Sequence, residues 1–399
     1  MGMAACASLV CITPPVLKNI NMKIISKLLV LAGIIAPVYG FCQQAGDTQQ
    51  GGIKQDNVAS APSCASGCCC GQGTQTPLGV MTDHVHPKGE WMVSYTYMDM
   101  NMKGSRAGAS NVSDETVYKA YDMSPETMQM QMSMFMVMYG ATNKLTLMLM
   151  SGFTSNYMTM NMNQAMQMMP GMNMSPMSMT QGAVNSTYGL SDTKIYGLYS
   201  IRQTMSDRLV GALGINLPTG STTQAGLNMF TGANGRLAYM MQLGTGSYGA
   251  LPSLTYVHTI GKFGVGAEGG ADVNLNKNAD GYTCGNIYNA TVWGSYRIFS
   301  FMSASLRAEG INQGRITGAD KNILNPSMTG GMEFDPTADP KNSGGTWVNT
   351  YAGLNFHLDK PVIKMFTFQC EYGLPVYQNL NGTQMAISSN ILAGIACKF

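Results

Sequence analysis

Apolar and polar residues alternate along most of the chain after residue 89. The clearest case is residues 127–140, TMQMQMSMFMVMYG, in which every even position from Met128 to Met138 is methionine. Side chains of a strand alternate between its two faces, whereas a helix repeats every 3.6 residues. The pattern therefore predicts a strand whose methionines all lie on one face.

The same two-residue period recurs in segments that continue to the end of the chain. Twelve strands are predicted, at residues 89–102, 127–139, 145–160, 187–202, 208–218, 246–258, 263–276, 285–297, 301–315, 346–358, 364–376 and 384–399. Short breaks lie at 140–144, 203–207, 259–262 and 298–300, and long polar breaks lie at 103–126, 163–186, 218–245, 277–284 and 316–345. This asymmetry and the even strand number are typical of bacterial outer-membrane barrels, which have short periplasmic turns and long outer loops.

The sequence thus predicts an all-β protein, an antiparallel transmembrane β-barrel of about twelve strands at residues 89–399. Only 11% of the 399 residues are charged and the net charge is +2, which gives no reason to expect a nucleic-acid partner. Beyond the N-terminus no run reaches the roughly 20 apolar residues of a membrane helix. A soluble β-sandwich would alternate in a similar way, but it rarely needs so many long strands with so little charge.

The polar face of each strand predicts the residues of the barrel lumen. In residues 263–276, for example, Phe263 and Val265 share one face while Glu268 and Asp272 share the other. The predicted lumen charges are Asp192, Lys194, Glu268, Asp272, Arg297, Arg307, Glu309 and Glu371. Because buried charges must pair or meet water, they either line a wet pore or hold a narrow barrel together.

The N-terminus is typical of an export signal. Residues 1–40 contain Met22 with Lys23 and Lys27, a short apolar stretch, and a small-residue cleavage site before Phe41, so Met22 is the expected true start. A lipoprotein reading through Cys42 is the alternative. Residues 41–88 are polar and rich in Gly, Gln and Ser, which predicts a flexible leader in the periplasm.

Methionine is concentrated in one part of the chain, since residues 81–179 hold 24 of the 36 methionines. In the long loop at 163–182 they alternate with polar residues, Pro and Gly and have no apolar partners. Thioethers are soft ligands that suit Cu(I), and methionine also provides adaptable apolar surface. The candidate metal ligands are Met158, Met160, Met162, Met166, Met168, Met169, Met172, Met174, Met177 and Met179; apolar contacts or no role at all are the alternatives.

The orientation of the strand methionines follows from their neighbours in two cases. The first and third strands place Met98, Met100, Met148 and Met150 on the lumen side, opposite aromatic and aliphatic residues. For residues 128–138 the sequence does not decide whether the methionines face the lumen or the lipid. Opposite the methionines are polar residues in one half, Gln129 to Ser133, and apolar residues in the other, Phe135 to Tyr139.

The leader carries a second candidate set of ligands. Cys64, Cys68, Cys69 and Cys70 precede His84 and His86, and thiolates and imidazoles bind copper and zinc. Their spacing matches no standard zinc site, and in an oxidising periplasm two disulfides are the alternative.

The stretches GVMTDHVHPKGEWMVSYTYMDMNMKG, LGINLPTGS and MQLGTGSYGALPSLTY carry a family resemblance. Over roughly residues 78–399 the chain resembles bacterial outer-membrane transporter-like barrels related to the family named for the meta-pathway of phenol degradation. The resemblance implies an outer-membrane β-barrel with a transport role. No catalytic residue follows from it.

The leading hypothesis from the sequence is an outer-membrane channel that binds and passes a soft metal ion such as Cu(I); no cofactor is required. The alternatives are a passive channel for small hydrophobic or aromatic compounds, and a metal-storing surface protein. An enzyme is disfavoured, because His258 and His357 fall at periplasmic strand ends without an adjacent nucleophile. Expected partners are outer-membrane lipid and, from the terminal Phe399, the outer-membrane assembly machinery.

Overall fold

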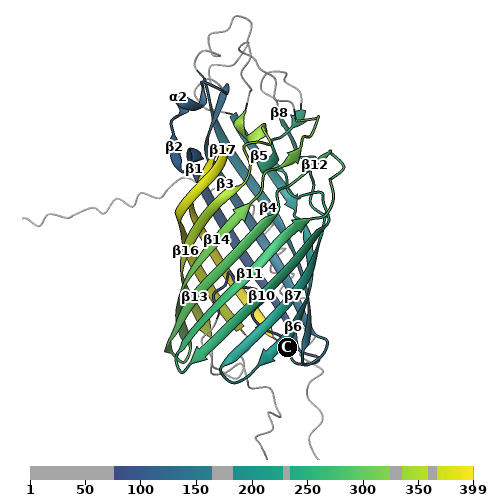
Figure 1. Cartoon of the computed structure of the whole chain (residues 1–399), viewed down its shortest axis with the longest axis vertical. Helices are drawn as coiled ribbons and strands as arrows, with labels where there is room; N and C mark the ends of the chain where they lie inside the picture. The colour runs from purple at the N-terminus through teal and green to yellow at the C-terminus, as the bar shows by residue number, and fades with distance from the viewer. Residues whose placement is uncertain (1–75, 164–182, 228–233, 324–334, 358–365, 399) are drawn as a thin grey trace, which may run out of the picture. The chain divides into compact units, whose positions relative to one another are not determined.

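The structure, a computed structural model, describes residues 76–163, 183–227, 234–323, 335–357 and 366–398. Within these ranges, eleven antiparallel strands pair in sequence order and the last pairs with the first, closing a barrel (Figure 1). The ring consists of β1 (Trp91–Gly108), β3 (Met123–Gly140), β4 (Leu145–Met162), β6 (Thr193–Gln203), β7 (Asp207–Leu217), β10 (Gly249–Ile260), β11 (Phe263–Asn274), β13 (Ile287–Phe299), β14 (Met302–Gln313), β16 (Gly345–His357) and β17 (Phe366–Lys398). Two further strands pair beside it, β2 (Ser110–Val112) with β1 and β5 (Ala183–Leu190) with β4.

Strand β17 explains why the ring has eleven strands where about twelve were predicted. Its first part, up to Leu380, pairs with β16, and its second part, from Leu380 to Lys398, pairs with β1. The chain therefore reverses within β17, next to Gly382, whose φ of +67° favours glycine. The two strands predicted at 364–376 and 384–399 are the two halves of β17.

The predicted strand at 187–202 is interrupted. β5 pairs with the far half of β4 and β6 with its near half, and Ser191 and Asp192 lie between them. The Asp192 side chain binds other parts of the chain there, accepting hydrogen bonds from the backbone of Gly220 and Thr245, both at 2.9 Å.

The two ends of the barrel differ in the way the breaks predicted. Short turns join β3 to β4, β6 to β7, β10 to β11 and β13 to β14 at one end, here called the short-turn end. The other, long-loop end carries α2 (Asp114–Val117), β8 (Ala225–Leu227), β9 (Asn234–Arg236), η3 (Tyr239–Met241), β12 (Tyr282–Thr283), β15 (Thr317–Gly318) and η4 (Pro336–Ala338) (Figure 1). In the described part of the chain, no helix is long and apolar enough to cross a membrane.

The outer face of the barrel is apolar. Along β13, Val292 is exposed while Thr291 and Trp293 are buried, and along β14 Leu306 is 71% exposed while Arg307 is buried. Aromatic pairs lie near the short-turn end. Trp91 pairs with Tyr139 and Phe263 with Tyr296 on neighbouring strands, and Phe299 of β13 stacks on Phe301 in the turn that follows. An apolar outer band flanked by aromatic residues is typical of strands that face lipid.

Candidate functional site

The inner face of β1, β3 and β4 is built from rows of methionine. The register places Met92, Met138 and Met148 opposite one another, and it does the same for Met102, Met128 and Met158. All six are buried, whereas Phe135, which lies between Met128 and Met138 on β3, is 49% exposed. The even-numbered methionines of residues 128–138 therefore face the lumen.

The polar residues opposite these methionines lie on the outer face near the long-loop end. Gln129 and Gln131 donate hydrogen bonds to Asp99 of the neighbouring strand, at 2.9 and 3.4 Å. Strands β1, β3 and β4 have 18 residues each, and about 9–11 suffice to cross a membrane. The polar outer residues Asp99, Gln129 and Gln131 thus lie where these strands extend beyond the length needed to cross a membrane.

Two methionine-rich apolar clusters lie in the lumen, one toward each end of the barrel. The loop-end methionine cluster contains Met102, Met123, Met128, Met158, Met160, Leu237, Met241 and Met385, with Met100 and Met130 packed against it. The turn-end methionine cluster contains Met92, Met136, Met138, Met148, Leu198, Val210 and Ala212, with Met81, Val85 and Tyr196 packed against it. Methionine sulfur here lies among aliphatic side chains, in an apolar rather than an aqueous environment.

Loop residues cover the loop-end methionine cluster, since Leu237 and Met241 come from the segment that joins β7 to β10. An ion-pair network fixes this segment. Arg236 Nη1 lies 2.6 Å from carboxylate oxygens of both Asp280 and Asp320, which belong to two other loops. Three loops are thereby joined over the lumen.

The N-terminal segment 76–90 crosses the lumen and contacts the inner wall on many sides. Thr82 Oγ1 donates to Glu268 on β11 at 2.8 Å, and the His86 amide donates to Thr146 on β4 at 2.7 Å. On the opposite side, Gln369 of β17 donates to the Thr76 carbonyl at 3.0 Å. The last residues of the predicted leader are therefore inside the barrel; the preceding ones lie outside the described residues.

Most of the predicted lumen charges are paired. Lys194 and Asp272 are 3.0 Å apart, and Arg307 contacts Glu371 at 2.7 Å and Glu309 at 3.5 Å. The remaining members bind polar groups: Glu268 accepts from Thr82 and Thr255, and Asp192 accepts from Asn216 and the loop backbone. Arg297 lies half-buried near the end of β13. These charges cross-link strands across the lumen and tie segment 76–90 to its wall.

His84 and His86 lie on this segment with their rings 4.9 Å apart. Nδ1 of His84 is 2.6 Å from Asp83, and Nδ1 of His86 is 2.6 Å from Glu90. Burial, together with the charge of His84, lowers the pKa of His86 to about 4. Burial alone would raise the pKa of Asp83, but His84, Arg208 and a bond from Thr76 hold it well below its usual range.

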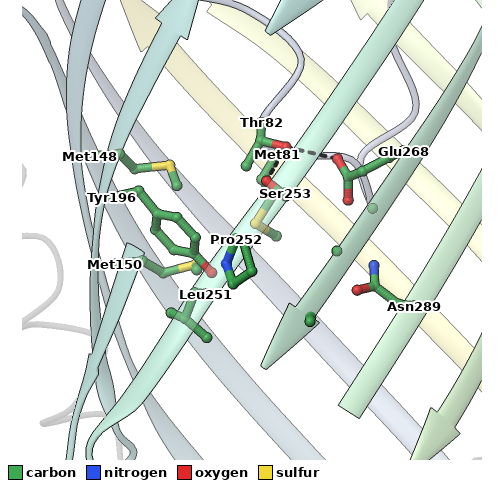
Figure 2. Close-up of a pocket in the computed structure, with 13 residues that line it drawn as sticks. Met81, Thr82, Met148, Met150, Tyr196, Leu251, Pro252, Ser253, Glu268 and Asn289 are labelled. Carbon is green, nitrogen blue, oxygen red and sulfur yellow. Dashed lines mark hydrogen bonds between the residues drawn. The ribbon is translucent and has the colours of Figure 1, made fainter. Parts of the chain in front are cut away.

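A cavity of about 160 Å³ lies between segment 76–90 and the wall. Figure 2 shows Met81 and Thr82 of the segment facing Met148 and Tyr196 on one side and Glu268 on the other. Its lining is thus apolar on the methionine side and polar on the side of Glu268 and Asn289.

The other predicted metal ligands, the predicted lumen methionines and the terminal Phe399 divide into two groups, those that the structure describes and those that it does not. Met158 and Met160 are buried in the loop-end methionine cluster, Met162 is half-buried at the end of β4, and Met98, Met100, Met148 and Met150 are on the inner face. Outside the described residues lie Cys64, Cys68, Cys69, Cys70, Met166, Met168, Met169, Met172, Met174, Met177, Met179 and Phe399. Among the residues that the structure describes, no three of His, Cys, Asp and Glu converge as metal ligands.

Neither a protein-family model nor a curated protein sequence matches the chain. Among solved structures, it is similar to an outer-membrane channel from Pseudomonas putida F1, with a TM-score of 0.50 and 15% identity over 79% of this chain and 98% of that one. The transport unit of the autotransporter AIDA-I from Escherichia coli has a TM-score of 0.44 and 10% identity over 81% and 94%. A Pseudomonas aeruginosa FadL homologue has 0.36 and 10% over 78% and 89%. The likeness to the first of these shows the fold, that of an outer-membrane β-barrel.

Proposed function

We propose that this protein is an outer-membrane channel for small hydrophobic or aromatic compounds. The observation that carries the proposal is the inner wall itself, where two methionine clusters follow one another from the long-loop end to the short-turn end. An unbranched thioether side chain adapts its shape to apolar ligands at little cost. The rest of the inner wall, on β10 to β17, carries hydroxyl, amide and paired charged side chains such as Thr291, Ser305 and Arg307, so the methionines form an apolar surface along one side of the lumen.

The cavity beside segment 76–90 supports the same substrate class. A cavity of about 150 Å³ is sufficient for a benzene-sized molecule. The apolar side, formed by Met81, Met148 and Tyr196, would contact a ring, and the polar side, with Glu268 and Asn289, would accept one polar substituent. Few convergent polar groups in an apolar pocket are typical of small-molecule sites.

Location and orientation belong to the proposal as well. The exposed apolar band and the aromatic pairs near the short-turn end favour insertion in an outer membrane, with the short turns and both chain ends of the barrel on the periplasmic side. The leader would then enter from the periplasm. Membership of the family related to the phenol meta-pathway barrels, and insertion by the assembly machinery, are parts of the same proposal.

Passage of a soft metal ion is the second candidate, and one observation favours it. Methionines from three adjacent strands lie directly opposite one another in two rows, Met92–Met138–Met148 and Met102–Met128–Met158. Several thioethers in one place suit Cu(I) or Ag(I). Their packing against Leu198, Val210 and Leu237 is what makes the first proposal the stronger one.

Two substitutions at one position separate the candidates. Met128→Leu keeps the apolar wall and removes the thioether, so uptake of [14C]toluene by intact cells should be retained while any silver uptake falls. Met128→Gln places an amide in the cluster and should slow toluene uptake. Met205→Gln, in an exposed short turn, is the matched control. Equal toluene uptake with leucine and glutamine at position 128 would contradict the first proposal.

A further inference from the structure

Two histidines meet inside the barrel in an arrangement that the channel function does not use. His84 and His86 come from segment 76–90, and their ring planes meet at 71° with centroids 4.9 Å apart. The side chain of His86 is 1% exposed. Both Nε2 atoms are buried, and no described residue forms a hydrogen bond with either of them.

The opposite ring nitrogens explain why the two Nε2 atoms are available. Nδ1 of each ring is 2.6 Å from a carboxylate oxygen, that of Asp83 for His84 and that of Glu90 for His86. A carboxylate at this position holds the proton on Nδ1, which leaves Nε2 with a free lone pair. A histidine that binds a metal through one nitrogen almost always donates its other N–H to a carboxylate, a carbonyl or water. Both histidines have this second partner in place.

The separation of the rings fits a shared ion. In a three-coordinate site with metal–nitrogen distances of about 2 Å, two imidazole nitrogens lie about 3.5 Å apart and their ring centres about 5 Å apart. The centres of the His84 and His86 rings are 4.9 Å apart. We propose that His84 and His86 together bind one Cu(I) ion through their Nε2 atoms, with a methionine of the turn-end cluster as third ligand.

The surroundings decide between copper and other ions. Thr146, which accepts the His86 amide hydrogen bond, precedes Met148 by two positions on the same face of β4. Met81 and Val85, on either side of His84, pack against the turn-end methionine cluster. Thioethers suit Cu(I), whereas a structural zinc site takes four ligands, mostly thiolates and imidazoles. The neighbouring carboxylates of Asp83 and Glu90 already contact the Nδ1 atoms, and in the described part of the chain no three His, Cys, Asp or Glu side chains converge as metal ligands, so the pair fits Cu(I) better.

This site does not depend on what the lumen conducts. Channels for apolar compounds and channels for metal ions can both hold a resident copper ion on segment 76–90. In sequence, the two histidines are also separate from the methionine-rich loop at 163–182 and from the four cysteines of the leader. A test must therefore remove the cysteines and detect copper coordination by histidine directly.

The experiment is a Cu(I) titration of the full barrel in detergent, without oxygen, against a chromogenic Cu(I) chelator. The starting chain carries Cys64→Ser, Cys68→Ser, Cys69→Ser and Cys70→Ser. His84→Gln and His86→Gln should each weaken the tightest site at least about tenfold, and Glu90→Gln should weaken it by about 10–100-fold, as loss of an outer carboxylate does. Glu90 is 28% exposed, so this variant leaves the segment packed.

His258→Gln is the matched control, because its Nδ1 also contacts a carboxylate, Asp207 at 2.8 Å, but no second described histidine stacks with it. Its affinity should equal that of the starting chain. X-ray absorption of the copper-loaded starting chain should show imidazole nitrogen together with sulfur. A sulfur-only spectrum, or unchanged affinity in the His84, His86 and Glu90 variants, would overturn the proposal. Tighter binding of zinc than of copper would overturn the assignment of the ion.

Discussion

Arg307 and Glu371 form the most buried ion pair that the structure describes, and its removal gives the sharpest test of the packed lumen. Their side chains are 2% and 1% exposed, and Glu371 Oε2 accepts from Nη2 and Nε of Arg307 at 2.7 and 3.2 Å. Arg307 also lies 3.7 Å from the ring centre of Tyr351. The perturbation is Glu371→Gln, which keeps the shape and removes the charge.

The expected cost follows from burial. Removing one partner of a buried pair costs about 3–5 kcal/mol, because the other charge is left uncompensated. Glu309 remains 3.5 Å from Arg307 and compensates part of the charge, so the lower end, about 3 kcal/mol, is expected. Combining Glu371→Gln with Arg307→Met removes both charges and should recover most of that loss, since apolar replacement of a buried pair is often neutral.

The assay is equilibrium urea unfolding of the barrel in lipid vesicles, followed by tryptophan fluorescence. Trp293 lies directly opposite Arg307 on the neighbouring strand and is buried, so it reports on this part of the wall. A single variant within about 0.5 kcal/mol of the parent, the range of surface substitutions, would refute the reasoning. Costs that simply add in the double variant would refute it equally.

Three further predictions concern the methionine wall, segment 76–90 and the loops. Met138→Ala should cost about 2–5 kcal/mol in the same urea assay and Met138→Leu less than about 1.5, because only alanine leaves a cavity in the turn-end cluster; equal costs would contradict the packing. A side chain at Gly79 would meet the guanidinium of Arg307, so Gly79→Val should displace segment 76–90 and raise the single-channel conductance. Gly269→Ala, whose added methyl group meets open space, should leave the conductance unchanged. Unchanged conductance in Gly79→Val would show that the segment does not obstruct the lumen. Burial raises the pKa of Asp335 beside η4 to about 6, well above that of an ordinary aspartate. A raised acid pKa favours the protonated form in the folded state, so about 3 kcal/mol of loop stability should be present below about pH 4 and lost as the pH rises through about 6. Hydrogen exchange of residues 335–342 checks this, and pH dependence that persists in Asp335→Asn would contradict it.

The strands were predictable because their signal is local. A two-residue period marks each strand and its lipid-facing side, and the predicted inner residues Glu268, Arg307 and Glu371 all meet partners across the lumen or on segment 76–90. The face of Met128–Met138 could not be decided from the sequence. Gln129 and Gln131 suggested an inner face, but they lie on the outer face and bind Asp99 near the long-loop end.

The sequence carries no comparable signal for the position of segment 76–90 inside the barrel. The segment has no periodic pattern, and its partners Thr146, Glu268 and Gln369 are 60 to 293 residues away in sequence. The pairing of His84 and His86 with their carboxylates is different, because Asp83 and Glu90 are sequence neighbours. The residue types suggested a metal site there, but only the folded segment shows two rings with centres 4.9 Å apart, each with a buried Nε2 atom that no described residue hydrogen-bonds.

The central claim is that the lumen passes small apolar molecules, and one measurement tests it most directly. Uptake of [14C]toluene is compared with uptake of a hydrophilic sugar of similar size, in intact cells with and without the protein. The account predicts that the protein accelerates toluene entry, that Met128→Gln or Met138→Gln removes much of the acceleration, and that sugar entry hardly changes. Acceleration of the sugar with no effect on toluene would contradict it.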